Sequence, residues 1–182
     1  GESFYQRSIA LYRSLGDRRG EGSALNNVGD AARNQGDYAR AREYFEQTLH
    51  IGREIGERWS EAVAQTNLSL VCENLGDYEG ARQYSEQALR CAREIGFRSN
   101  EGYDLTNMGH ALSGLERFEA AREAYQAALD LRREIGEQHL IPETLAGMAR
   151  LALAQGEPQQ ALAHIEPILD FLEDSGLEGT EE

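Results

Sequence analysis

The sequence predicts an all-α solenoid in which antiparallel helical hairpins stack on one another. The first observation is a repeated segment, because the pattern from Gly76 to Gly96 returns 40 positions earlier and 40 positions later. The second is the composition, which is 40% hydrophobic and 27% charged with only 3 prolines in 182 residues, as expected of amphipathic helices. The third is a set of single positions spaced by 40, namely Ile9, Leu49, Leu89, Leu129 and Leu169, and Gly16, Gly56, Gly96, Gly136 and Gly176.

Each period contains two predicted helices separated by a short break. In the period from 60 to 99, Ser60 is expected to cap the first helix and Asp77 the second, after a break at Gly76. Gly96 suits the left-handed residue that ends the second helix. Asn100 stands in the place of Ser60, Asp37 in that of Asp77, and Gly56 and Gly136 in that of Gly96. The predicted helices cover residues 2–15, 21–35, 38–55, 60–75, 78–95, 100–115, 117–135, 142–155 and 157–173.

Apolar and small residues indicate how these helices pack. In the helix over 78–95, apolar residues recur at steps of three and four and form one buried stripe. Small residues at Ala41, Ala81, Ala121 and Ala161, and at Gly29, Ser69, Gly109 and Ala149, permit close approach between helices. Pro167 is expected to kink the last helix, either because the array turns there or because a degenerate repeat tolerates it.

These positions resemble the tetratricopeptide repeat family over essentially the whole chain. An apolar residue followed by a small one occurs at Val28-Gly29, Leu68-Ser69, Met108-Gly109 and Met148-Ala149. The family's later alanine, aromatic and alanine positions are occupied by Ala41, Phe45 and Thr48, by Ala81, Ser85 and Ala88, by Ala121, Tyr125 and Ala128, and by Ala161, Ile165 and Ile168. The period of 40 is longer than the usual 34 or so. This long form is similar to repeats of kinesin light chain, of cell-polarity adaptors and of sensor arrays in bacterial STAND-type ATPases.

The resemblance implies a right-handed superhelix divided into five parts. Residues 1–19 form the second helix of a truncated repeat. Full repeats follow at 20–59, 60–99 and 100–139, with a degenerate repeat at 140–179 and then an acidic tail. Both ends are expected to be cut, which leaves helix-stacking surfaces partly bare at each end.

Charge and cysteine content limit the possible partners and location. The net charge is −14, with 32 acidic residues against 18 basic ones, and every basic residue is arginine. Such a chain is poorly suited to nucleic acid or to an anionic membrane surface. Cys72 and Cys91 fall at buried helical positions, which favours free thiols in a reducing compartment over a disulfide. We therefore expect a cytoplasmic location.

No residues converge to support catalysis. The four histidines, His50, His110, His139 and His164, lie in different repeats without ligand spacing, and no glycine-rich phosphate loop is present. We expect no enzyme activity, no metal and no cofactor.

A column of asparagines marks the predicted binding groove: Asn27, Asn67 and Asn107, with Gly147 in fourth place. In the resembling family these positions face the concave groove, where an amide can bond both groups of a ligand's peptide bond. Alternatively, the amides bridge neighbouring helices and only stabilise the stack. The other predicted groove residues are Asn26, Asp30, Arg33 and Asn34, then Thr66, Leu70 and Asn74, and finally Tyr103, Thr106 and His110.

Three further features qualify this groove. It lacks the basic pairs of carboxylate-clamp repeats, because Tyr103 and Asn107 stand where those would be. Arg53, Arg93 and Arg133, beside Glu54, Glu94 and Glu134, predict ion pairs from repeat to repeat, with a stripe for an acidic partner as the alternative. Trp59, the only tryptophan, is interpreted as a local packing residue unless it is exposed.

The leading hypothesis is a non-catalytic module that binds a protein or peptide along its concave face, as the sensor or scaffold part of a larger bacterial signal-transduction protein. A small effector in the groove is a variant of it. The alternative is a structural array that self-associates through its helical ends and has no groove ligand. No nucleic-acid or membrane partner is expected.

Overall fold

The computed structural model describes residues 2–174, so the position of Gly176 and the acidic tail lie outside the described residues. Within this range the chain forms nine α-helices and one short 3-10 helix. Their bounds are α1 Glu2–Leu15, α2 Arg18–Asn34, α3 Tyr38–Ile55, α4 Arg58–Asn74, α5 Tyr78–Ile95, α6 Arg98–Gly114, α7 Phe118–Glu134, η1 Gln138–Leu140, α8 Ile141–Ala154 and α9 Pro158–Asp174.

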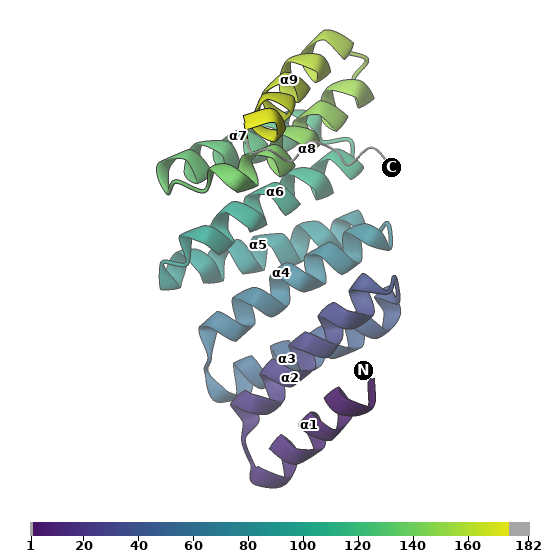
Figure 1. Ribbon diagram of the computed structural model, residues 1–182, viewed down its shortest axis with the longest axis vertical. Helices are drawn as coiled ribbons and strands as arrows, with labels where there is room; N and C mark the ends of the chain where they lie inside the picture. The colour runs from purple at the N-terminus through teal and green to yellow at the C-terminus, as the bar shows by residue number, and fades with distance from the viewer. Residues whose placement is uncertain (1, 175–182) are drawn as a thin grey trace.

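The helices stack as successive layers from one end of the molecule to the other (Figure 1). Four hairpins, α2–α3, α4–α5, α6–α7 and α8–α9, follow the single helix α1. Neighbours within the series α2, α4, α6 and α8 contact each other, whereas within 2–174 no such contact joins α3 to α5 or α5 to α7. The array therefore curves with the even-numbered helices on its concave side. We call these the inner helices and the odd-numbered ones the outer helices. The predicted all-α solenoid is confirmed.

The inner helices α2, α4 and α6 begin two or three residues earlier than predicted, and α8 begins one residue earlier. The residue before α4 is Glu57 and the residue before α6 is Phe97, and neither makes a side-chain capping bond. Ser60 lies inside α4 and donates to Glu57 at 2.7 Å, so its predicted capping role is wrong. Asn100, predicted to cap α6, is buried within it. The predicted caps on the outer helices are confirmed, because Asp37 and Asp77 accept bonds from the amides of Arg40 and Gly80.

Left-handed residues end the helices where glycine was predicted. Gly56 and Gly96 have φ values of 70° and 69° at the ends of α3 and α5. The turns between the two helices of a hairpin use Gly36, Gly76 and Gly156 in the same conformation, and at the equivalent place Glu116 has φ 58°. This backbone is costly for a side chain, so the third hairpin closes with local strain that the others avoid.

Each hairpin is closed by a matched pair of residues, one on the inner and one on the outer helix. A Cβ atom added at Gly29 would lie 2.6 Å from the Phe45 ring, and one at Gly109 would lie 2.5 Å from the Tyr125 ring. In the second hairpin, Ser69 and Ser85 occupy these places and their hydroxyls are 2.6 Å apart. In the fourth, Ala149 is matched with Ile165. A small inner residue thus faces a side chain whose size fits the space available.

Gln65 interrupts a leucine column in the core. Leu25, Leu105 and Leu145 are buried at the equivalent places, whereas Gln65 is only 4% exposed and its Oε1 has no hydrogen-bond partner among the described residues. Replacing Gln65 with leucine is expected to raise the free energy of unfolding by about 1–2 kcal/mol, because a buried unpaired acceptor is removed. Urea denaturation followed by circular dichroism measures this change. Gln83→Leu on the exposed side of α5 is the control and should change stability by less than about 0.5 kcal/mol.

Ion pairs line the edge where hairpins join, but not with the predicted partners. Glu54, Glu94 and Glu134 pair with Arg18, Arg58 and Arg98, which lie at the start of the inner helix of the same hairpin. Links between hairpins come from Arg13 to Glu21 at 2.5 Å and from Arg93 to Glu101 at 2.7 Å. Arg53 instead contacts Gln87, and Arg133 pairs with Asp130 in its own helix. Of the three predicted arginines, only Arg93 makes an ion pair from one hairpin to the next.

A buried arginine joins the last hairpin to the third. Arg132 is fully buried, where Gly52 and Ala92 occupy the equivalent places. Its guanidinium donates to the carbonyl of Leu140 and, at 2.8 Å, to Thr144, and it lies over the Tyr103 ring at 5.2 Å. Here the inner helix α8 begins late, after η1, and the arginine fills the space beside that turn.

Pro167 lies inside α9, which continues through it to Asp174.

Cys72 and Cys91 are free and buried, as predicted. Burial raises the pKa of Cys72 to about 11, so this thiol stays protonated and unreactive. None of the helices in the described range has the length and apolarity needed to cross a membrane.

Candidate ligand-binding groove

The three predicted asparagines differ in what their amides bind. Asn27 is exposed, and its side-chain amide makes no hydrogen bond within residues 2–174. Asn67 donates to Asn26 Oδ1 at 3.1 Å and so bridges α4 to α2. Asn107 is only 3% exposed, yet its Nδ2 has no partner among the described residues. Bridging between helices therefore accounts for Asn67, whereas the amides of Asn27 and Asn107 keep unused donors.

The column ends at Gly147 because no side chain fits there. A Cβ atom at this position would lie 2.7 Å from Tyr125 Cε1 and 3.0 Å from His110 Nε2. The tyrosine ring is buried in the core of the third hairpin and cannot retreat without loss of packing. Packing thus explains why glycine follows the three asparagines.

A small cavity of about 100 Å³ opens beside Asn26 and Asn27. Its walls come from α2, from Thr48 at the outer helix α3, and from the first turns of α4. Trp59 stands at this cavity, 53% exposed, with its ring stacked on Phe97 at a centroid distance of 6.2 Å. Trp59 is therefore exposed, which was the stated exception to its interpretation as a packing residue: one part of the ring packs on Phe97 and the rest is accessible. The lining residues are Gly22, Ser23, Asn26, Asn27, Thr48, Trp59, Ser60 and Val63.

Two predicted groove threonines lie beneath the surface, between adjacent inner helices. Thr106 is fully buried, with its hydroxyl 3.0 Å from that of Thr144. Thr66 donates to Asp104 Oδ1 at 2.7 Å and accepts from Asn100 at 2.9 Å. Both hydroxyls are used within the protein and are out of reach of a ligand, which corrects their assignment to the groove surface.

Asp104, which sequence inspection missed, is a fully buried carboxyl, and no ion pair joins it to a basic residue of the described range. Its Oδ2 accepts from Asn100 at 2.9 Å, and its other oxygen accepts from Thr66. Burial raises the pKa of Asp104 to about 7, although the bonds from Thr66 and Asn100 act in the opposite direction. The neutral form of Asp104 therefore persists to a higher pH than that of an ordinary aspartate.

His110 connects three inner helices. Its Nδ1 lies 3.3 Å from Glu73 Oε2 on α4, and Arg150 Nη2 on α8 lies 3.1 Å from its Nε2. The His110 ring also meets the edge of the Tyr125 ring, with centroids 5.5 Å apart. Two partners of His110, Glu73 and Arg150, were not among the predicted residues, although Arg150 falls 40 positions after it.

The remaining predicted residues line the same surface. Asp30 accepts from Asn26 and from Arg33, each at 3.2 Å. Asn74 is exposed and donates to the carbonyl of Leu70 at 2.7 Å. Tyr103 is half-buried over Arg132. Apart from the buried Thr66, Thr106 and Asn107, the predicted groove residues therefore lie on one polar surface over α2, α4 and α6. Its members include Asn34, Leu70 and the exposed or half-buried residues named above.

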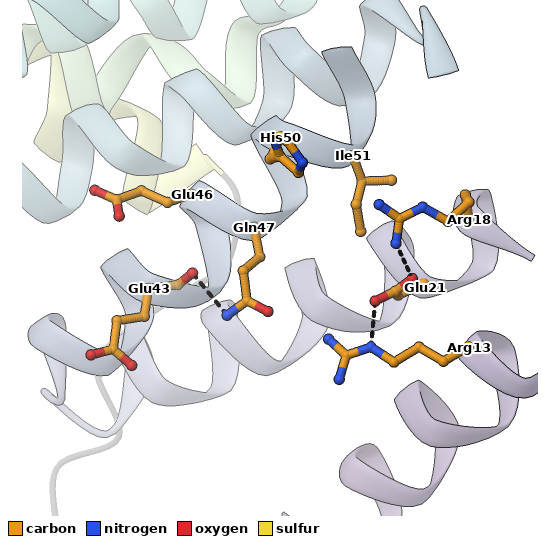
Figure 2. Close-up of a pocket in the computed structure, with 8 residues that line it drawn as sticks. All are labelled: Arg13, Arg18, Glu21, Glu43, Glu46, Gln47, His50 and Ile51. Carbon is orange, nitrogen blue, oxygen red and sulfur yellow. Dashed lines mark hydrogen bonds and ion pairs between the residues drawn. The ribbon is translucent and has the colours of Figure 1, made fainter. Parts of the chain in front are cut away.

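A larger cavity of about 510 Å³ lies on the other side of the array, between α1, α2 and α3. Figure 2 shows Arg13 and Arg18 both directed at the carboxylate of Glu21, at 2.5 Å each. In the same view Glu43 and Glu46 point away from this cluster. The charged groups are thus already paired with one another or diverge, so the larger cavity offers no convergent site.

Among residues 2–174, no group of three or more histidine, cysteine, aspartate or glutamate side chains could hold a metal ion. What the described chain does offer on its concave side is a polar surface with an exposed free amide at Asn27, an accessible tryptophan at Trp59 and an exposed arginine at Arg150. Stacked hairpins that present such a surface define a helical-repeat solenoid.

The sequence pattern of the tetratricopeptide repeat matches residues 1–54, 20–94, 60–134 and 103–174, and the chain belongs to that family. Its members are generally non-catalytic interaction modules, and no catalytic family is indicated.

Solved structures share the fold at low sequence identity. Aspartyl phosphate phosphatase F from Bacillus subtilis matches with a TM-score of 0.83 and 14% identity, over 96% of this chain and 46% of its own. A STAND protein with a tetratricopeptide repeat sensor, from Pyrococcus horikoshii, matches with a TM-score of 0.74 and 20% identity, over 95% and 28%. A kinesin light chain-like repeat protein from Podosopora anserina matches with a TM-score of 0.72 and 14% identity, over 95% and 86%.

The chain thus spans less than half the length of two of these proteins. No curated protein sequence matches it.

Proposed function

We propose that the chain binds an extended segment of a partner protein along the surface of its inner helices. The observation that carries this proposal is the pairing of an unused amide at Asn27 with a cavity beside the half-exposed Trp59. An accessible tryptophan next to a pocket supplies apolar contact area, and free amides can bond a ligand backbone irrespective of its sequence. The groove residues that would take part are Asn26, Asn27, Asp30, Arg33, Asn34, Asn67, Leu70, Asn74, Tyr103 and His110, whereas Asn107 is buried beneath them.

Within a larger protein this array would act as a sensor or scaffold. The likeness to a repeat sensor in a STAND protein supports a place in signal transduction, and the buried reduced thiols suit the cytoplasm. The chain would recognise a partner, while another part of the protein would respond.

Removing Trp59 and Asn27 together is expected to weaken a groove ligand by about two orders of magnitude. A central tryptophan commonly contributes about 2 kcal/mol and a hydrogen bond about 1 kcal/mol. The measurement is affinity capture from a bacterial lysate by the wild type and by Trp59→Ala, Asn27→Ala, with captured proteins identified by mass spectrometry. Both side chains are exposed, so the variant should keep its helicity, and the loss of the Trp59–Phe97 stacking should lower the melting temperature only slightly.

The matched control carries Glu43→Ala and Glu46→Ala on the outer helix α3. A partner retained by this control and lost from the groove variant supports binding at the inner helices. A partner lost from the outer-helix variant and kept by the groove variant would place the site on the opposite face and contradict the proposal.

A second candidate, self-association through the ends, is favoured by exposed apolar residues on the terminal helices. Leu11 on α1 is 57% exposed, whereas Ile51, Cys91 and Leu131 at the equivalent places are buried by the inner helix of their own hairpin. On α9, Leu162, Leu169 and Leu172 are exposed. Light scattering over a range of concentrations tests this candidate, and a constant monomer mass would exclude it.

A further inference from the structure

The exposed side of α9 carries a stripe of leucines that the other outer helices lack. Leu162, Leu169 and Leu172 are 55%, 52% and 38% exposed, and their spacings of seven and three residues place them along one side of the helix. The equivalent residues of α7 are Arg122, Leu129 and Arg132. Two of the three leucines therefore replace a charged group, and in α3 and α5 the same two places are an arginine and a small residue.

In α7 the equivalent residues contact the next hairpin. Arg122 donates to Gln155 Oε1 at 2.8 Å. Arg132 donates to Thr144 at 2.8 Å, and Leu129 packs among apolar residues of α8 and is 3% exposed. Helix α9 lies at the end of the stack, where no further helix of residues 2–174 covers its leucine stripe (Figure 1). The stripe therefore continues a surface on which, one repeat earlier, a helix packs.

Two carboxylates border the leucine stripe without a basic partner on their own helix. Glu166 and Glu173 are exposed, and each follows a leucine of the stripe by four residues. At the place of Glu166, α3 has Glu46, which pairs with Arg42 at 3.0 Å. In α9 the place of that arginine is occupied by Leu162, and the helix contains no arginine or lysine. Neither Glu166 nor Glu173 forms an ion pair within residues 2–174, so the border of the stripe keeps its negative charge.

We propose that this side of α9 is a docking surface for an amphipathic helix of a partner protein, in which basic residues border the apolar stripe. The leucine stripe extends from Leu162 to Leu172, which is about 15 Å at 1.5 Å per residue, or about three helical turns. A helix laid along it would place its own apolar residues against these leucines. Arginine or lysine on the border of that helix would form charge-assisted bonds with Glu166 and Glu173. The surface lies on an outer helix, so it would bind its partner independently of the groove.

A second copy of the chain complements this surface poorly. Two α9 helices could bring their leucines together, but the carboxylates of each would meet no arginine or lysine of the other helix in any orientation. Each copy also carries a net charge of −14, which opposes the approach of another copy and attracts a basic partner. The sequence after Asp174 adds three glutamates and one leucine. A basic helix from a different protein is therefore the complementary occupant.

Two synthetic peptides of about 18 residues test this proposal by fluorescence anisotropy with the full chain. Both are alanine-rich and carry leucines at helical spacings of three and four residues, but one has arginine on the border of its stripe and the other has glutamine. The arginine peptide should bind at least about tenfold more tightly than the glutamine peptide. Leu162→Gln combined with Leu169→Gln should weaken binding of the arginine peptide at least about tenfold, because apolar contact is lost. Glu166→Gln combined with Glu173→Gln should remove most of the preference for arginine.

Two further variants are matched controls. Leu75→Gln combined with Leu153→Gln removes two exposed leucines outside α9. Glu43→Gln combined with Glu123→Gln removes two exposed carboxylates from α3 and α7, with the same change in net charge as the α9 variant. Both controls should bind the arginine peptide as the wild type does. All the substituted side chains are exposed, so circular dichroism should show unchanged helicity.

The proposal is overturned if the wild type binds neither peptide, or if the α9 leucine variant and its control bind the arginine peptide equally well. Equal affinity of the wild type for both peptides would contradict a basic partner and overturn it too. A wild-type dimer in light scattering that Leu162→Gln with Leu169→Gln dissociates would assign the stripe to a second copy, with the same consequence. Each of these results leaves groove binding standing, because the groove is formed by the inner helices.

Discussion

Replacing Gly109 with alanine is expected to lower the free energy of unfolding by about 2–3 kcal/mol. The new methyl group would lie 2.5 Å from Tyr125 Cε1, well inside the contact distance of two carbon atoms. The Tyr125 ring is 1% exposed and packs among Leu129, Leu145 and Met148, so it has no space to move into. Overpacking of this kind costs about 3 kcal/mol or more, and the better helix propensity of alanine returns about 1 kcal/mol. Urea denaturation followed by circular dichroism measures the loss.

Two variants show whether the ring is the cause. Ser69→Ala changes the equivalent place in the second hairpin, where the opposing residue is Ser85, and should cost only about 1 kcal/mol. Gly109→Ala combined with Tyr125→Ile copies the Ala149–Ile165 pair of the fourth hairpin and should recover at least about 1 kcal/mol through coupling. If the double variant is no more stable than the sum of its single changes predicts, the proposed match between inner and outer residue is wrong.

Changing Asp104 to asparagine is expected to stabilise the array at pH 8 by up to about 4 kcal/mol relative to its effect at pH 4. Burial raises the pKa of the folded carboxyl to about 7, while its ordinary value is 3.8. Because the folded pKa is the higher one, the stability that the proton confers is complete below about pH 4. It is lost as the pH rises toward 7. The difference of about 3 pKa units corresponds to about 4 kcal/mol.

The asparagine variant cannot ionise, and a rotated Asn100 amide can still exchange hydrogen bonds with it and with Thr66. The measurement is the difference in unfolding free energy between variant and wild type from pH 4 to pH 8. Taking this difference removes the opposite trend of surface carboxylates such as Glu79, whose pKa falls to about 2 beside Arg82. A difference that stays constant across this range would show that burial does not raise the pKa of Asp104 and would contradict the prediction.

The repeat columns of the sequence were sufficient to predict the architecture, because stacking is a periodic property. Helix number, hairpin order and the small residues at Gly29 and Gly109 all follow from positions spaced by 40. Helix starts were predicted too late because Ser60 and Asn100 are good capping residues, yet each lies inside its helix. Packing extends α4 back to Arg58 and α6 back to Arg98, and this effect outweighs the preference of Ser60 and Asn100 for the capping position.

The polar surface was predictable as a set, but its individual roles were not. Asn27, Asn67 and Asn107 share one column, yet one is free, one bonds Asn26 and one is buried without a partner. These differences depend on which residue of the adjacent inner helix each amide contacts. The contacting residue lies close to one period away in the sequence but in a different column, so the column alone does not identify it. The exposure of Trp59 likewise depends on the angle of the joint before α4, and a single sequence does not specify that angle.

The glycine–aromatic contact forms within a single hairpin, and this limits where recombination can divide such an array. Gly109 and Tyr125 belong to one hairpin, whereas the bonds from Thr66 to Asp104 and from Asn67 to Asn26 cross between hairpins. Duplicating or exchanging a whole hairpin therefore keeps glycine and ring together and changes only the polar junctions. A crossover at the turn around Gly36 or Glu116 would separate glycine from ring, so inherited length variants of this array are expected to begin and end at the joints near Gly56 and Gly96.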